Sequence, residues 1–315
     1  MTFGIRMHRI LFMAMALLLS TPAGAADHPL LNKIWDVGAA QFLGEDELMI
    51  RLMGTRYVLL GETHDNAEHH WLQAQVLERL VRLDRRPVVA FEQMDANQQP
   101  ALDRYLAEHG RDLAGLPGLG DAVRWSDGWM AWRFYQPIAE VAQGAGLPII
   151  AANVPDATLR TVMRDPAAVD ADLAVRTRLH EPLPAAAALS LERELVAMHC
   201  GMTGPAMGPV IQTMAVGQRL RDSAFADALV RFDRGSGGVL IAGAGHTRTD
   251  RGVAWVLRQM QPDLTVAGVM FREVIDALTE PGDYARTLVD TPTLPFDYVW
   301  FTGGGEGGRG EDPCR

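Results

Sequence analysis

Residues 57–65 read YVLLGETHD, an apolar run that ends in polar side chains. The apolar part predicts a buried strand, and the alternation of side chains along a strand puts Glu62 and His64 on the same side. Asp65 precedes Glu68 by three residues, which is the spacing of a helix N-cap and its partner. The stretch therefore predicts a strand followed at once by a helix, with polar groups at the junction.

The same alternation of strand and helix patterns continues along the chain. Strands following helical stretches predict an α/β fold with a mostly parallel central sheet and helices on both faces. Residues 154–190 predict an inserted helical cap, and residues 296–301 predict an edge strand. The other predicted strands are 88–91, 147–151, 239–242 and 264–270, and the predicted helices are 67–83, 96–107, 130–143, 191–198, 210–232 and 252–260.

The first 25 residues have the three parts of a signal peptide. Arg6 and Arg9 precede an apolar run at 10–19, and Ala23 and Ala25 provide a small-residue cleavage site before Ala26. No cysteine stands at this junction, so we expect a periplasmic or secreted protein without a lipid anchor, although an uncleaved anchor shares the same pattern. We expect one domain at 26–302 and a glycine-rich tail at 303–315.

Composition excludes one class of partner. Removal of Arg6 and Arg9 changes the formal charge from −10 to −12, and the remaining cations are scattered among acidic residues. Nucleic acid is therefore not an expected partner. Cys200 and Cys314 are the two cysteines, and an oxidising compartment permits either a disulfide between them or two unpaired thiols.

Acidic and histidine residues follow three of the predicted strands. Glu62 and His64 follow the first strand, Glu92 the second, and His246 a later one. Ligands of parallel sheets bind at the carboxyl ends of the strands, where these four side chains would meet. Each residue alone could be a capping or solvated group. Together they predict a site, either with all four as general acids and bases or with Glu62, His64 and His246 binding a divalent metal.

The predicted helix at 210–232 carries polar side chains on its apolar face. Gln218 and Asp222 lie on this face, and Arg221 beside them could pair with a carboxylate at the strand ends. Polar groups on a core-facing stripe are hydrogen-bonded or functional. Structural hydrogen bonding remains the alternative for these residues, as it does for His69 and His70 on the first helix.

A third region concentrates imidazole and sulfur. His199 is followed by Met202 and Met207 in a segment rich in glycine and proline. Haem iron is bound in proteins by histidine, methionine, cysteine or tyrosine, so this loop is a candidate haem site. The alternative is that the methionines fill gaps in a core.

Several of these motifs resemble the ChaN-like proteins of the Tiki superfamily. The likeness runs in order from about residue 31 to 274 and adds Arg248 and Asp250 as supporting residues. It implies haem binding and a link to iron uptake, and leaves Tyr57, Tyr105 and Tyr135 as haem-ligand candidates beside His199 and His246. The matching motifs are GETHDN at 61–66 with HH at 69–70, FEQM at 91–94, HCG at 199–201, QRLRD at 218–222 and GAGHTRTDRGV at 243–253.

The resemblance leads to one principal hypothesis and two alternatives. The principal hypothesis is an exported haem-binding protein in haem or iron uptake, with outer-membrane uptake components as partners and with a homodimer around haem left open. The wider superfamily includes Tiki proteases and erythromycin esterases, so the first alternative is a hydrolase that uses Glu62, His64, Glu92 and His246. The second alternative is an envelope scaffold whose polar cluster only ties strand ends together.

Overall fold

The computed structural model describes residues 28–201, 204, 207–288 and 291–304. The predicted signal peptide, Met202, Cys314 and most of the predicted tail lie outside these residues. The described chain forms one eight-stranded sheet in the order β2-β1-β8-β7-β3-β6-β4-β5. The strands are β1 (Ile34–Asp36), β2 (Gln41–Leu43), β3 (Tyr57–Glu62), β4 (Val88–Asp95), β5 (Ile149–Asn153), β6 (Gly238–Gly243), β7 (Val266–Glu273) and β8 (Tyr298–Thr302).

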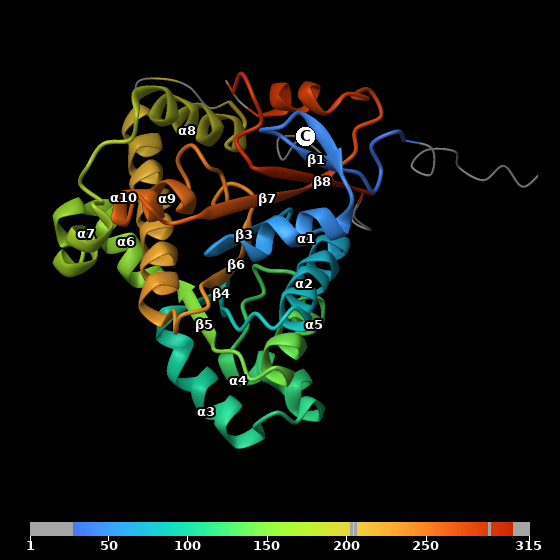
Figure 1. The fold of residues 1–315 in the computed structure, drawn as a ribbon. Helices are drawn as coiled ribbons and strands as arrows, with labels where there is room; N and C mark the ends of the chain where they lie inside the picture. Colours follow the sequence, from blue (N-terminus) through green and yellow to red (C-terminus); the bar gives the residue numbers. More distant parts are fainter. Residues whose placement is uncertain (1–27, 202–203, 205–206, 289–290, 305–315) are drawn as a thin grey trace, which may run out of the picture.

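Helices cover both faces of this sheet, as the sequence predicted (Figure 1). On one face lie α1 (Glu45–Met53), α2 (Ala67–Arg82) and α5 (Trp132–Gly144), and on the other lie α9 (Met207–Phe232) and α10 (Val253–Met260). The remaining helices are α3 (Gln99–His109), α4 (Leu119–Val123), α6 (Asp156–Arg164), α7 (Ala171–Thr177) and α8 (Ala185–Met198), with 3-10 segments at Ala96–Gln98, Leu113–Gly118, Pro166–Ala168 and Pro281–Thr287.

The alternation along β3 explains the two-sided core. Val58 and Leu60 pack in the cluster formed with α1, α2 and α5, whereas Tyr57 and Leu59 pack in the cluster formed with α9 and α10. All six residues of β3 are buried. A central parallel strand therefore reads as a continuous apolar run, because both of its faces are covered.

The strand predicted at 296–301 is present as β8, but the prediction that it lies at the edge of the sheet is wrong. Strand β8 pairs in parallel with β7 on one side and antiparallel with β1 on the other. Strands β1 and β2, each of three residues, were too short to give a recognisable pattern in the sequence. Their addition moves β8 into the sheet interior, and the outer strands of the sheet are β2 and β5.

The predicted N-cap of the first helix is also one residue off. Asp65 is exposed, and Asn66 caps α2 by accepting hydrogen bonds from the backbone N–H groups of Glu68 (2.9 Å) and His69 (3.3 Å). Glu68 instead accepts a hydrogen bond from the backbone N–H of Gly303. Because β3 extends to Glu62, the turn into α2 begins later than the sequence suggested.

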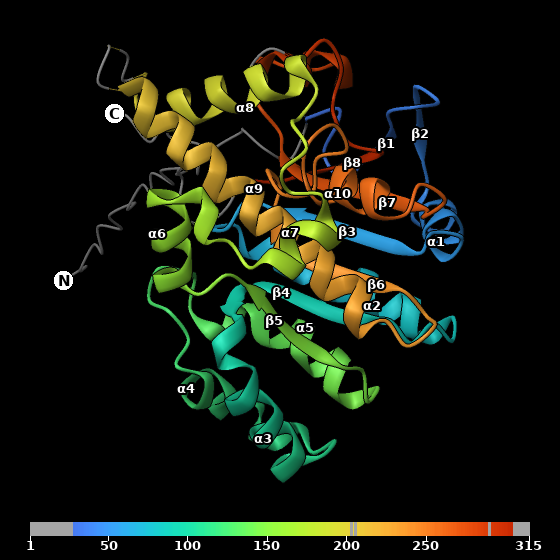
Figure 2. The same cartoon turned by 90° about the vertical axis from the view of Figure 1, so that its left-hand side faces the viewer.

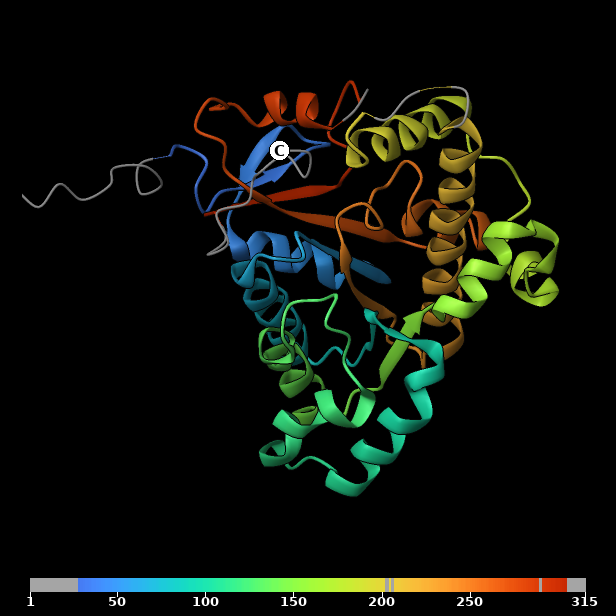
Figure 3. The ribbon, with the colours of Figure 1, turned by 180° about the vertical axis from the view of Figure 1, so that it is seen from behind.

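The inserted segment at 154–190 is helical, as predicted, and forms α6, α7 and the start of α8. Helix α9 runs along the sheet, and α8 lies across the end of α9 at which α9 begins (Figure 2). Seen from behind, α8 and α3 lie at opposite ends of the domain (Figure 3). Among the described residues, no helix is both long and apolar enough to cross a membrane.

The connections that follow two neighbouring parallel strands leave toward opposite faces of the sheet. After β3 the chain passes through α2 on one face, and after β6 it passes through α10 on the other face, although β3 and β6 are paired. Loops that leave adjacent strands toward opposite faces open a crevice at the carboxyl ends, where ligands of such sheets bind. The topology therefore places the candidate site after Glu62 and Gly243.

Substitution of Gly61 tests how tightly the end of β3 packs against the loop that follows β6. A Cβ at Gly61 would lie 2.2 Å from Thr247 Oγ1 and 3.0 Å from Ala244 Cα. We expect Gly61→Ala to lower the free energy of unfolding by about 1–3 kcal/mol in urea denaturation, because the overlap forces the backbone apart. The control, Gly54→Ala, meets nothing closer than 3.5 Å and should change stability by less than about 0.5 kcal/mol. Equal stability of the two variants would contradict the packing.

Candidate functional site

The strand-end residues form two hydrogen-bonded groups on opposite faces of the sheet. Glu62, the last residue of β3, continues the face that carries Val58 and Leu60 and points toward α2 and α5. Glu92 in β4 continues the face of Val88 and Ala90 and points toward α9. The sequence therefore located the four residues at one end of the sheet, and the structure divides them between its two faces.

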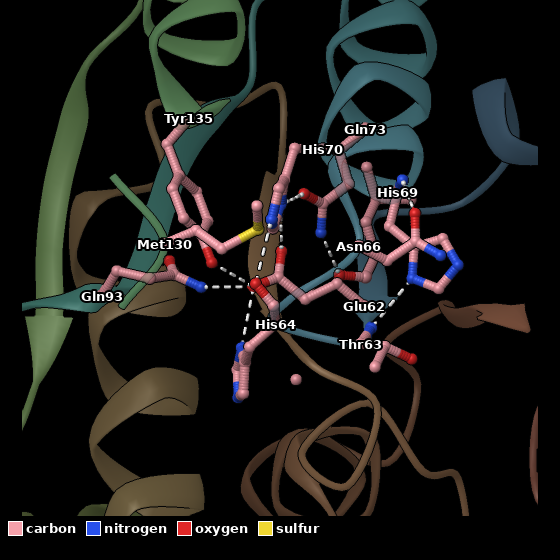
Figure 4. Close-up of polar contacts among 12 residues, drawn as sticks. Glu62, Thr63, His64, Asn66, His69, His70, Gln73, Gln93, Met130 and Tyr135 are labelled. Atoms are coloured by element: carbon pink, nitrogen blue, oxygen red, sulfur yellow. Dashed lines mark hydrogen bonds and ion pairs between the residues drawn. The ribbon is translucent and has the colours of Figure 1, made fainter. Parts of the chain in front are cut away.

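The Glu62 carboxylate is the centre of the first group (Figure 4). Its Oε1 accepts hydrogen bonds from His64 Nδ1 (2.9 Å), Gln93 Nε2 (2.9 Å) and Tyr135 Oη (2.7 Å), and its Oε2 faces His70 Nδ1 at 3.1 Å. Burial acts to raise the pKa of Glu62, but His70 and His64 outweigh it and hold the pKa well below its usual range. Glu62 is therefore an ionised carboxylate in a buried site.

Two neighbouring histidines of α2, His69 and His70, are buried and have different hydrogen-bond partners. His70 Nε2 faces the backbone carbonyl of His64 at 3.2 Å, so both of its ring nitrogens meet acceptor oxygens. His69 Nδ1 accepts from the backbone N–H of Thr63 (2.9 Å), and its Nε2 donates to Thr302 Oγ1 (2.8 Å). Burial lowers the pKa of His69 to about 3. His69 is thus a neutral link between the β3 turn and the end of β8.

His64 is the most exposed of the four predicted site residues. Its side chain is 42% exposed, against 0% for Glu62, 3% for Glu92 and 7% for His246. Its Nδ1 is held by Glu62, its ring packs edge-on against Trp129 with centroids 4.8 Å apart, and its Nε2 has no hydrogen-bond partner among the described residues. Burial lowers the pKa of His64, but Glu62 and Glu92 more than compensate, so the net shift is upward.

His246 is the centre of the second group. Its Nε2 lies 3.1 Å from Glu92 Oε1 and its Nδ1 lies 2.7 Å from Asp222 Oδ1, while the Gln218 amide nitrogen lies 3.0 Å from Nδ1. Burial lowers the pKa of His246, but the two carboxylates raise it overall. Burial raises the pKa of Asp222, against the opposing effect of His246. Gln218 and Asp222, which the sequence placed on a core-facing stripe, both contact this imidazole.

Gly243 joins the two groups through the sheet. Its backbone N–H donates to Glu92 Oε2 (2.7 Å), and a Cβ at this position would lie 2.8 Å from His64 Nε2. The His64 ring therefore occupies the space that a side chain at position 243 would need. The missing side chain is what allows His64 to approach the end of β6.

The donor geometry does not support a metal site made of Glu62, His64 and His246. In the part of the chain that the structure describes, no group of three or more His, Cys, Asp or Glu residues is arranged to bind a metal ion. Glu62 already accepts four contacts on one face, while His246 lies between two carboxylates on the other. Both oxygens of Glu62 and both ring nitrogens of His246 are thus engaged within their own groups, and His64 Nε2 is the one donor atom of the three residues without a partner among the described residues.

The other supporting residues hold the elements around the crevice. Arg248 is almost fully buried and donates to Asp250 (3.0 and 2.7 Å), to Glu194 (3.3 Å) and to Ser190 (3.3 Å), which ties α8 to the loop after β6. Arg221 forms no ion pair among the described residues, and its buried Nε has no hydrogen-bond partner. The expected pairing of Arg221 with a strand-end carboxylate is therefore limited to an electrostatic attraction to Asp95, the last residue of β4.

Three tyrosines were candidate haem ligands, and none has a free hydroxyl. Tyr135 is fully buried and donates to Glu62, and burial raises its pKa far above the ordinary value. Tyr57 donates to Asp233 (3.0 Å) at the amino end of β3, and burial raises its pKa to about 12. Tyr105 donates to the carbonyl of Gly115. These contacts argue against each of them as an iron ligand.

The candidate haem-binding segment that begins at His199 lies at the corner between α8 and α9. His199 follows α8 and is half-buried, and its Nδ1 lies 2.7 Å from the carbonyl of Leu195. Met207, the first residue of α9, lines a cavity of about 260 Å³ together with Val196 and Ile211. Met198 and Val210 are exposed beside it, at 59% and 39%. This corner is separate from the Glu62 group.

Sequence reasoning missed part of the Glu62 group. It left His70 as a structural histidine, and it gave no role to Gln93, Gln73 or Trp129. Gln93 is adjacent to Glu92 in β4, so the alternation of the strand could have placed it on the Glu62 face. The contact between Trp129 and His64 joins segments 65 residues apart, and no local pattern indicates it.

Comparisons with known proteins give one family and one strong structural match. The family model described as haem-binding uptake, Tiki superfamily, ChaN matches residues 48–257. A structure described as cofacial haem binding to ChaN of Campylobacter jejuni has 18% sequence identity and a TM-score of 0.67, covering 86% of this chain and 97% of that one. No curated protein matches the chain.

Two other solved structures are less similar to this chain. The type III effector HopBA1 has 13% identity and a TM-score of 0.44, covering 82% of this chain and 93% of its own. An erythromycin esterase in its open conformation has 15% identity and a TM-score of 0.38, covering 77% of this chain and 76% of its own.

The charge state of His246 predicts a pH dependence of stability. The carboxylates of Glu92 and Asp222 overcome burial and raise the pKa of His246 from 6.5 to about 10. Its contribution is complete below the unfolded-state pKa and is lost as the pH rises through the folded-state value. We expect the free energy of unfolding to fall between pH 6.5 and 9.5 by up to about 1.4 kcal/mol per pH unit, measured by urea denaturation.

Two variants make this measurement specific. His246→Gln should remove the decline, because no imidazolium remains between the carboxylates. His180→Gln, at an exposed position outside the cluster, should keep the wild-type slope. A His246→Gln variant with the same slope as the wild type would refute the assignment.

Proposed function

Since the chain belongs to the haem-binding uptake family of ChaN in the Tiki superfamily, we propose that it is an exported protein that binds haem at the α8–α9 corner for haem or iron uptake. The match covers the segment from α1 to α10, which includes both histidine groups and this corner. Haem is cargo in this proposal, so no reaction step is assigned to it.

The orientation of His199 is the main observation that supports this location of the binding site. Its Nδ1 donates to the Leu195 carbonyl at 2.7 Å, which leaves the lone pair of the neutral ring on Nε2. Nε2 has no hydrogen-bond partner among the described residues, and in this proposal it is the atom that binds the iron. Histidines that bind metals are commonly oriented by such a hydrogen bond on the other ring nitrogen. Nε2 of His64 likewise has no hydrogen-bond partner among the described residues, but a buried carboxylate holds this ring within a polar cluster.

The surroundings of His199 fit a porphyrin edge. Val196, Met207 and Ile211 form the apolar part of the lining of the adjacent cavity, and Glu192, Arg193 and Gln212 contribute polar groups to it. Met198 and Val210 are exposed apolar side chains of the same two helices. Apolar contact with the macrocycle and an imidazole for the iron are the groups that a haem site requires. Met207 is a second sulfur candidate at this corner, and Met202 lies outside the described residues.

The size of the cavity supports a shared site. At about 260 Å³ it is at the small end of cavities that enclose small ligands, and a porphyrin would leave much of its surface uncovered. A second copy of the chain would cover this surface, so we include a homodimer around haem in the proposal. The structure of the Campylobacter protein is described as cofacial haem binding, which is compatible with this arrangement.

The proposals that the chain is exported and that it has partners in that compartment are based on the amino-acid sequence. The charged and apolar residues at 1–19 and the small residues before Ala26 support a cleaved signal peptide and a periplasmic or secreted mature chain. Outer-membrane uptake components are then the expected partners of a haem carrier in that compartment.

A haemin titration of the mature chain from Ala26 tests the binding site. We expect a saturable, shifted Soret band in the wild type, and His199→Ala should weaken binding by about tenfold or more or move the band, because an iron ligand is lost. His180→Ala, at an exposed position, should leave both unchanged. An unaltered spectrum and affinity in His199→Ala would remove His199 as the ligand, and no specific band in the wild type would refute haem binding.

One observation favours hydrolysis as a second candidate function. His64 Nδ1 is held at 2.9 Å by a buried carboxylate, and Nε2, which lies against Gly243 at the end of β6, has no hydrogen-bond partner among the described residues. This is the arrangement of a general base, which removes a proton from water as the water attacks an ester or amide carbonyl, and then returns a proton to the leaving group. Glu62 would orient the ring and stabilise its charged form.

The hydrolase candidate predicts a specific mutant pattern. With p-nitrophenyl acetate as probe, Glu62→Gln and His64→Ala should each lower the rate by about 10²–10⁴-fold, because the base loses its orientation or is absent. Glu78→Gln, at a partly exposed position of α2, is the control and should retain the wild-type rate. Circular dichroism would verify that the variants fold, and full activity in both site variants would exclude this function.

A further inference from the structure

An open cavity of about 560 Å³ lies at the carboxyl end of the outer strand β5. Helices α6 and α7 of the inserted segment pack against α9 beside this strand (Figure 3), and the cavity lies between these helices and residues 151–155. Its lining residues are different from those of the Glu62 group, the His246 group and the α8–α9 corner. Open α/β sheets bind ligands at the carboxyl ends of their strands, so the cavity has the position of a ligand site.

Small side chains keep this cavity open. Ala151 and Ala152 of β5 and Ala224 and Ala228 of α9 form much of its apolar lining. Its volume is within the range of roughly 300–1,000 Å³ that is common for small-ligand sites. The lining therefore suits a ligand with a compact apolar body, such as a benzene ring or a short alkyl chain.

Asn153, the last residue of β5, contributes a hydrogen-bond donor to this cavity. The residue is only 4% exposed, and its Oδ1 accepts a hydrogen bond from the backbone N–H of Val154 (2.8 Å). Its Nδ2 has no hydrogen-bond partner among the described residues, and the side chain is part of the cavity lining. Buried polar groups are rarely left without a partner. The Asn153 amide is therefore suited to a ligand that carries an acceptor oxygen.

The N-terminus of α6 adds positive potential beside Asn153. The helix has nine residues and begins at Asp156, and its N-cap, Pro155, makes no side-chain capping hydrogen bond. The unpaired N–H groups and the aligned peptide dipoles of a helix N-terminus attract anions. Asp95 accepts a hydrogen bond from the backbone of Asp156 and compensates part of this potential. Pro155 and Thr158 line the cavity, so the first turn of α6 borders it.

Two arginines in the wall of the cavity share one carboxylate. Arg176 of α7 donates two hydrogen bonds to the buried Asp227 of α9 (2.7 and 3.0 Å), whereas Arg231 contacts the same carboxylate only at 3.4 Å. The Arg231 side chain is 59% exposed. Because Asp227 compensates one of the two positive charges, the arginines add a further positive charge to this wall.

Two acidic residues of α7 also line the cavity. Asp170 caps this helix by accepting a hydrogen bond from the backbone N–H of Leu173 (2.7 Å), and Asp172 lies in the first turn. Carboxylates at a helix N-terminus are partly compensated by the N–H groups and the helix dipole. The two carboxylates nevertheless disfavour a ligand that carries more than one negative charge.

We propose that this cavity binds a small monocarboxylate with an apolar body. The ligand carboxylate accepts a hydrogen bond from Asn153 Nδ2 at the N-terminus of α6, the body lies along Ala152 and Ala228, and Arg231 attracts the anion along the α9 wall. The inference goes beyond the proposed haem function and does not depend on it, because the two sites share no residue.

Calorimetric titration of the mature chain from Ala26 tests the class of ligand. Benzoate, benzamide and benzylamine share one ring and differ in the charge of the polar group. We expect saturable binding of benzoate, at least about tenfold tighter than that of benzamide, because a charged acceptor forms the stronger hydrogen bond, and no binding of benzylamine. Hexanoate, which has no ring, should also bind. Failure of both carboxylates to bind, or tighter binding of benzylamine, would overturn the proposal.

Three substitutions test the location of the site. Asn153→Asp keeps the oxygen that accepts from Val154 but replaces the free donor with a carboxylate oxygen, so benzoate affinity should fall by at least about tenfold. Ala228→Phe fills the cavity without a change of charge and should abolish benzoate binding. Arg231→Gln should lower the affinity by about threefold, since one positive charge is lost. Arg234→Gln, at an exposed position outside the cavity lining, is the matched control and should retain the wild-type affinity.

Circular dichroism and thermal unfolding would verify that each variant folds. Arg231 is exposed, so Arg231→Gln decides the location if either buried substitution prevents folding. Wild-type benzoate affinity in all folded cavity variants would mean that benzoate binds elsewhere, and the site would be excluded. If haemin does not bind while benzoate behaves as expected, the haem proposal fails and the carboxylate site remains.

Discussion

The buried carboxylate of Glu62 is the constraint on which this end of the molecule depends. An ionised group removed from water must be compensated by donors, and here they come from four segments: His64 in the turn, His70 on α2, Gln93 on β4 and Tyr135 on α5. Each donor fixes one element relative to β3. Loss of the charge would therefore disturb the packing of the whole α2–α5 face, which is why a scaffold role and a chemical role of this residue are physically linked.

On the other face of the sheet the buried charge has the opposite sign and is compensated in a similar way. His246 lies between Glu92 and Asp222, so a positive ring is enclosed by two carboxylates where Glu62 is surrounded by donors. Gly243 connects the two arrangements, because its N–H binds Glu92 and its missing side chain leaves room for His64. Both groups thus require the same close approach of β3, β4 and β6. His64 alone among the four predicted residues extends substantially into solvent, which makes it the group that can meet another molecule.

The haem proposal and the polar cluster occupy different parts of one end of the domain. His199 at the α8–α9 corner lies near the apolar side chains of Val196 and Met207, and its Nε2 has no hydrogen-bond partner in the part of the chain that the structure describes, whereas His64 belongs to a hydrogen-bonded acidic cluster. Iron binding favours the first environment and proton transfer the second. Arg248 and Glu194 connect them mechanically by tying α8 to the loop that carries His246.

The sequence determined the α/β class, the parallel central strands and the end of the sheet where Glu62, His64, Glu92 and His246 gather, because apolar runs and their polar ends follow from local periodicity. Tertiary structure decided the rest. The pairing of β1 with β8 and the contacts of Trp129 with His64 and of Tyr135 with Glu62 join distant segments that share no local pattern. The separation of Glu62 and Glu92 onto opposite faces follows from the register of the strands. Leu60 and Phe91 both pair with Ile241, so Glu62 lies two residues after this level and Glu92 one residue after it, and this register exists only once the sheet is assembled.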